Sequence, residues 1–148
     1  MKALVQRVTE ASVTIDGEVV AEIGRGYLVL FGVTHGDTEA MADKLASRVV
    51  KLRIFEDENG KTNKSIEDVA GSVIVVSQFT LYADTDHGNR PGFSYAGKPE
   101  QANALYEYIL EKTRETVPVV EKGIFGADMK VALVNDGPFT IVLEDRDL

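Results

Sequence analysis

The chain has 148 residues, a formal net charge of −8, 44% hydrophobic residues and 27% charged residues. We expect one globular domain over residues 1–148 that buries its own core, with no apolar run of about 18 residues that could cross a membrane. The absence of cysteine excludes disulfides, thiolate catalysis and cysteine-ligated metal sites, and it fits a cytoplasmic protein. The acidity argues against broad electrostatic binding to nucleic acid.

Alternating apolar and polar residues predict strands in the N-terminal part of the chain. Three of them form a meander with a tight turn at Asp16-Gly17, and a fourth, buried strand follows. The four predicted strands cover residues 4–8, 12–15, 19–23 and 27–33.

Two helices are predicted, one on each side of the middle of the chain. The first is capped at residues 37–38 and ends near position 52. The second begins at Pro99, a favoured first helical residue, and ends near position 114. The first helix carries Lys44, Arg48 and Lys51 on one face. Such a stripe is typical of a solvated face, and the alternative is a local seat for phosphates on an acidic protein.

Between the helices lies the segment around which we expect the chain to be organised, SVIVVSQFTLYA at residues 72–83. Its β-branched run predicts a central strand buried on both faces. Ser77, Gln78 and Thr80 follow at the exit of that strand. Uncharged polar side chains at such a place either satisfy nearby backbone groups, as most buried polar residues do, or face a ligand.

Strand and loop patterns also surround the second helix. A long irregular loop at residues 84–97 precedes it, and loops of this length are often functional. A short edge strand is expected at residues 117–120, and strands at residues 129–134 and 139–143 predict a terminal hairpin. About ten strands and two main helices together indicate an α+β domain with a curved, barrel-like and mostly antiparallel sheet.

The turn of this hairpin is predicted at Asn135-Asp136-Gly137-Pro138, whose residue types favour turns. Gly137 tolerates positive φ, and Pro138 can follow a cis peptide bond. Only about 5–6% of bonds before proline are cis, so these residues alone do not justify assigning that form.

Several different short motifs, each present once, follow one another along nearly the whole chain. Each is weak by itself, and their combination is specific. They are Gln6-Arg7-Val8 with Ala11-Ser12-Val13, Leu52-Arg53-Ile54-Phe55, Ser77-Gln78-Phe79-Thr80-Leu81, Arg90-Pro91, Phe125-Gly126-Ala127-Asp128-Met129 and Asn135-Asp136-Gly137-Pro138. The set resembles the D-aminoacyl-tRNA deacylases, also called D-tyrosyl-tRNA deacylases. One difference is Gly92, where the family usually has serine, so a contact from that hydroxyl is in question.

The resemblance implies a cytoplasmic homodimer that needs no cofactor, metal or membrane. It implies a carboxylic ester hydrolase that releases D-amino acids from the terminal adenosine of tRNA, and glycine mischarged on tRNA(Ala). The implied catalytic residues are Ser77, Gln78, Phe79 and Thr80. The implied substrate-binding residues are Phe125, Ala127, Met129, Gly137 and Pro138. The last two are implied to be joined by a cis bond and inserted from the partner subunit, as a wall that rejects L-amino acids.

The residues of this site favour catalysis by positioning. Because an ester is already activated, backbone N–H groups near Phe79 and Thr80 would hold its carbonyl while the 2′-hydroxyl of the tRNA assists water. Two alternatives stay open. One is an esterase whose nucleophile is Ser77 or Thr80, although no histidine or lysine base stands in the motif. The other is a non-catalytic dimeric module that binds RNA ends or a small acidic ligand.

Overall fold

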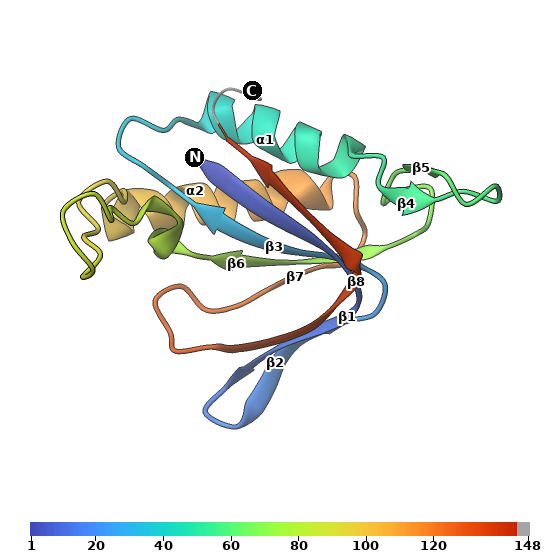
Figure 1. The fold of residues 1–148 in the computed structure, drawn as a ribbon, viewed down its shortest axis with the longest axis horizontal. Helices are drawn as coiled ribbons and strands as arrows, with labels where there is room; N and C mark the ends of the chain where they lie inside the picture. Colours follow the sequence, from blue (N-terminus) through green and yellow to red (C-terminus); the bar gives the residue numbers. More distant parts are fainter. Residues whose placement is uncertain (145–148) are drawn as a thin grey trace.

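The computed structural model describes residues 1–144 and consists of a strongly curved sheet with two helices packed on one of its faces (Figure 1). Neither helix is long and apolar enough to cross a membrane. The elements are β1 (Lys2–Ile15), β2 (Glu18–Ile23), β3 (Gly26–Gly32), α1 (Glu39–Lys51), β4 (Phe55–Glu56), β5 (Thr62–Lys64), β6 (Ser72–Ser77), the 3-10 helix η1 (Phe79–Tyr82), α2 (Pro99–Arg114), β7 (Val120–Lys122) and β8 (Lys130–Leu143).

The long strand β1 organises the sheet. Its strand order is β2-β1-β3-β6-β7, and β8 pairs with β1 outside that path. β1 is antiparallel to β2, β3 and β8, whereas β6 is parallel to β3 and to β7. The predicted α+β class with a curved, barrel-like and mostly antiparallel sheet is confirmed. The parallel pairs arise because α1 and α2 lie in the connections that lead into β6 and β7, as crossover connections do.

Two predictions about the strands are wrong. The predicted strands at residues 4–8 and 12–15 are one strand, β1, which is irregular near Val8 and does not break there. The predicted terminal hairpin does not exist, because both of its halves pair with β1 in the same direction and form the single strand β8. Asn135 lies opposite Val8 and Thr140 lies opposite Gln6, so residues 136–139 bulge out of the ladder.

The core has two parts, one on each face of the sheet. Tyr27, Phe31 and Val73 face α1 and α2, and Val8 and Ile74 belong to a second cluster inside the curl of the sheet. The run at residues 73–76 is therefore buried on both faces, as predicted. The helix caps also agree with the prediction, since the Thr38 hydroxyl accepts from an amide in the first turn of α1 and Pro99 begins α2.

Candidate functional site

The polar segment that follows the buried run of β6 lies at the surface. Ser77 ends β6, the Gln78 amide donates to the Phe31 carbonyl at 2.8 Å, and the chain then turns into η1. Phe79 is 53% exposed. Ser77 and Gln78 are half-buried, and the Gln78 side-chain amide donates to the hydroxyl of the exposed Thr80. The strand exit therefore faces outward, as a segment that meets a ligand must.

The backbone of η1 offers hydrogen-bond donors at this surface. A helix leaves its first N–H groups without a partner in its own turn. Among residues 1–144, no acceptor pairs with the backbone N–H groups of Phe79 and Thr80. These two donors are available to an oxygen of a bound molecule.

Lys2 is a neighbour of η1 that the motif did not reveal. Its Nζ donates to the Leu81 carbonyl at 3.3 Å and lies 4.7 Å from the centroid of the Tyr82 ring. Both contacts hold the ammonium group beside η1. A positive charge beside η1 can stabilise an anionic group there, and only the pairing of β1 with β3 brings it to this end of the sheet.

The loop at residues 123–129 runs beside the end of β6. The parallel pairing of β6 with β7 ends at Val75 and Lys122, and the loop begins at the residue that follows β7. Phe125, Ala127 and Met129 are all half-buried. The ladder thus brings these three predicted substrate-binding residues to the same end of the sheet as the segment at residues 77–80.

The Gly137-Pro138 turn projects from the bulge in β8, and its peptide bond is cis. Arg7, which is 7% exposed, supports the turn from within. Its Nε donates to the Asp136 carbonyl at 3.0 Å, and its guanidinium carbon lies 4.7 Å from the centroid of the Phe139 ring. Gly137 has a φ of 135°, and a Cβ built there would lie 3.1 Å from Arg7 Nη2. This position therefore disfavours any larger residue.

A second contact anchors Arg7 itself. Its Nη1 donates to the Ile54 carbonyl at 2.6 Å, in a buried position. On the other side of the turn, the Asn135 side chain accepts from the Phe139 amide at 2.7 Å and donates to Thr140. Sequence reasoning placed Arg7 in a family motif without a role. The signal that pointed to it is a charged residue on the strand face that also carries Ala3 and Val5.

The turn and the segment at residues 77–80 do not meet within one chain. Ser77 pairs with Phe31, which is opposite Ala3 of β1, whereas the turn follows the pairing of Val8 with Asn135. Five residues along β1 and three strand spacings place them on the order of 20 Å apart along the sheet. Figure 1 shows η1 and the interruption of β8 in different parts of the molecule. A site that uses both segments must take them from two chains.

The loop at residues 84–97 covers the same end of the sheet as η1. Asp84 and Gly92 exchange two backbone hydrogen bonds at 2.8 and 2.9 Å. Phe93 packs edge-on against Phe79, with 5.0 Å between the ring centroids. A Cβ built on Gly92 meets nothing within 4 Å. The serine that the family usually has would fit there, so its absence does not distort the loop.

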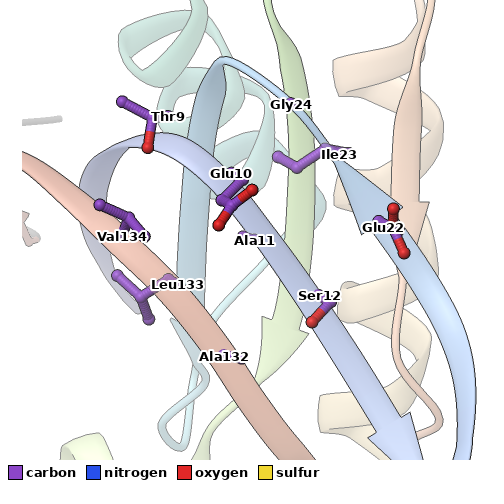
Figure 2. A pocket seen from close by; sticks show the side chains of 10 residues that line it. All are labelled: Thr9, Glu10, Ala11, Ser12, Glu22, Ile23, Gly24, Ala132, Leu133 and Val134. Atoms are coloured by element: carbon purple, nitrogen blue, oxygen red, sulfur yellow. The ribbon is translucent and has the colours of Figure 1, made fainter.

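A separate hollow of about 620 Å³ lies on the face formed by β1, β2 and β8 (Figure 2). Glu10, Ser12 and Glu22 line it together with Leu133 and Val134. It is distant in the sheet from the segment at residues 77–80, because its lining comes from the second half of β1. Its two carboxylates oppose the binding of phosphate, and we do not assign the ester site to it.

The basic stripe on α1 is exposed as expected. Lys44, Arg48 and Lys51 all lie on the solvent side of the helix, and none of them takes part in the ion pairs formed among residues 1–144. Within the same residues, no cluster of three or more histidine or acidic side chains is arranged to hold a metal ion. The exposure of the stripe fits both of its interpretations.

Comparison with known proteins identifies the family. Residues 4–144 match the D-Tyr-tRNA(Tyr) deacylase family. A relative from Paracoccus denitrificans (strain Pd 1222), named D-aminoacyl-tRNA deacylase, is 56% identical over 99% of each chain. One of the same name from Thermomicrobium roseum (strain ATCC 27502 / DSM 5159 / P-2) is 55% identical over 100% of this chain and 96% of its own.

A solved structure agrees over nearly the whole molecule. The structure titled c-Myc DNA Unwinding Element Binding Protein is 45% identical, with a TM-score of 0.93, over 98% of this chain and 99% of that chain. Fold, motifs and full-length relatives all lead to one assignment. The chain belongs to the D-Tyr-tRNA(Tyr) deacylase family of hydrolases.

Proposed function

We propose that this protein is a cytoplasmic D-aminoacyl-tRNA deacylase that acts as a homodimer of single-domain chains. The names of its full-length relatives support the reaction. The observation that carries the proposal is the separation of the Gly137-Pro138 turn from the segment at residues 77–80 within one chain. Two copies related by a twofold axis would complete two identical sites, each made from one segment of each chain.

The free edge of β8 supports the dimer. Among the described strands, β8 pairs only with β1, so its outer edge is open. Val134 and Val142 on this strand are 48% and 49% exposed. A long open edge with apolar side chains invites association, and native proteins usually cover it. A second copy that covers this edge would carry its own turn toward a neighbouring site.

The proposed chemistry is hydrolysis without a protein nucleophile. Water attacks the ester carbon, and the backbone N–H groups of Phe79 and Thr80 donate to the carbonyl oxygen as it gains negative charge. The tetrahedral intermediate collapses, so the bond to the 3′-oxygen of the adenosine breaks and the free carboxylic acid forms. The vicinal 2′-hydroxyl relays the proton of the attacking water to the leaving 3′-oxygen. The Thr80 hydroxyl accepts from Gln78, which suits a group that lines the pocket better than one that attacks.

Chirality would be read by exclusion. The Gly137-Pro138 turn of the partner would present backbone carbonyls to the substrate ammonium and leave no space for a side chain in the L arrangement. Side chains of D-amino acids would point away from the turn, so the protein would discriminate little among them. Glycine has no side chain to exclude, so glycine on tRNA(Ala) would also be released. The contacts of Arg7 support this role, because the turn must be rigid if it is to exclude the side chains of L-amino acids.

One experiment tests the reaction and separates it from the alternatives. The purified protein is incubated with D-aminoacyl-tRNA and with L-aminoacyl-tRNA, and free amino acid is followed over time. Selective release from the D ester is expected. Equal release from both esters would indicate a general esterase. No release, with retained binding of the tRNA, would indicate a nucleic-acid-binding module.

A mixing experiment tests the shared site. Phe79→Pro removes a backbone N–H from one segment, and Gly137→Val blocks the other. If the site is shared, mixing the two inactive variants restores one intact site in each mixed dimer, or about one quarter of the wild-type activity for random pairing. If activity does not recover after subunit exchange has been confirmed, the site is not shared. A protein that light scattering shows to be a monomer, and that is fully active at the same concentration, would also contradict the shared site.

A further inference from the structure

Tyr106 is a buried hydroxyl that the proposed reaction does not use. It lies on the inner face of α2, is 1% exposed, and donates to the Val75 carbonyl at 2.6 Å. Burial raises the pKa of Tyr106 to about 12, and the neighbouring backbone amide of Gly123 offsets part of that shift. The side chain is therefore a neutral phenol that ties α2 to β6 at Val75.

The hydroxyl stands where the ladder between β6 and β7 stops. The last pair of that ladder is Val75 with Lys122. The Tyr106 hydroxyl donates to the carbonyl of Val75, the last residue of β6 that pairs with β7. Beyond this point the two segments of the chain diverge. The segment after β6 leads to residues 77–80, and the segment after β7 leads into the loop at residues 123–129.

The same tyrosine also contacts residues expected to bind substrate. Its ring lies 6.4 Å from the Phe125 ring, measured between centroids. Gly123 packs directly under the Met129 sulfur, where a Cβ on Gly123 would collide with Sδ. A shift of Gly123 would therefore be transmitted to Met129, and a shift of the Tyr106 ring to Phe125.

We propose that Tyr106 is a positioning residue of the deacylase site, whose hydroxyl sets the spacing between the segment at residues 77–80 and the loop at residues 123–129. The inference rests on the proposed function and names a residue outside the family motifs. Loss of the hydroxyl should loosen the loop that holds the substrate while leaving the backbone donors of η1 in place. Substrate binding should weaken, and the chemical step should change little.

Tyr106→Phe is the test variant, because it removes the hydroxyl and keeps the ring. Tyr108→Phe is the matched control. It lies on the same helix, and its exposed hydroxyl donates to Asp43 at 2.7 Å, away from the loop. Initial rates on D-aminoacyl-tRNA give kcat and KM for the wild type and both variants. Hydrogen exchange is measured over residues 123–129, and thermal melting is recorded for all three proteins.

For Tyr106→Phe we expect KM to rise about 3- to 10-fold, the effect of one lost hydrogen bond, with kcat changed by less than about twofold. Exchange over residues 123–129 should become faster, and Tyr108→Phe should change neither property. A lower melting temperature with unchanged KM and exchange would overturn the proposal. If the wild type itself releases no D-amino acid, the proposed function fails, and the exchange measurement still decides whether Tyr106 holds the loop.

Discussion

Replacing Arg7 with lysine tests whether the Gly137-Pro138 turn acts through its rigid support. Arg7 is buried and donates to two backbone carbonyls that approach from different segments, those of Asp136 and Ile54. A lysine keeps the charge, but its single ammonium cannot reproduce the planar fork that spans both carbonyls. At least one carbonyl therefore loses its partner.

The size of the effect follows from these contacts. A hydrogen bond to a charged group contributes about 1.5–3 kcal/mol, so the loss of one should lower the free energy of unfolding by about that amount. The stacking of the guanidinium on Phe139, with 4.7 Å to the ring centroid, weakens as well. We expect kcat/KM on a D-aminoacyl-tRNA to fall about 10- to 100-fold, because the lost hydrogen bond no longer holds the turn in the conformation that the site needs.

The assay compares release of free amino acid from D- and L-aminoacyl-tRNA, with urea unfolding measured on the same preparations. Arg25→Lys is the control, because Arg25 also stacks on an aromatic ring, that of Phe55 at 5.1 Å, but is exposed and donates no hydrogen bond to the turn. Arg25→Lys should leave the rate and the ratio of the two rates unchanged. An Arg7→Lys variant with wild-type rate and wild-type discrimination would refute the reasoning.

The other predictions concern the turn, the strand exit and the basic stripe. Gly137→Ala, which places a Cβ 3.1 Å from Arg7 at a φ of 135°, should lower the D-specific rate or the chiral selectivity at least about tenfold, and unchanged values in the same assay would remove the turn from the site. Thr80→Ala should retain most of the turnover, while a tRNA ending in 2′-deoxyadenosine and charged with a D-amino acid should be hydrolysed poorly; the reverse outcome would establish Thr80 as the nucleophile. Replacing Lys44, Arg48 and Lys51 together with alanine should weaken tRNA binding and reduce the slope of log affinity against log salt by about one unit per lost phosphate contact, and unchanged binding would return the stripe to a solvated face.

Local sequence patterns determined the elements that depend on neighbours along the chain. The β-branched run at residues 73–76 is a strand buried on both faces, Thr38 caps the first helix and Pro99 begins the second. These features follow from side-chain stiffness, burial and the hydrogen-bonding needs of helix ends, which are local properties. The family motifs, read together, led to the same family that the full-length comparisons show.

Tertiary structure alone decided how the two halves of β8 pair. The turn residues at positions 135–138 have the composition of a hairpin, yet both flanking segments pair with β1, because that strand is long enough to hold them in one line. The roles of Lys2 and Arg7 also depend on partners far away in sequence, at Leu81 and Asp136. Strand pairing over such separations is set by the burial of whole faces and not by local preference, so no short window of sequence contains it.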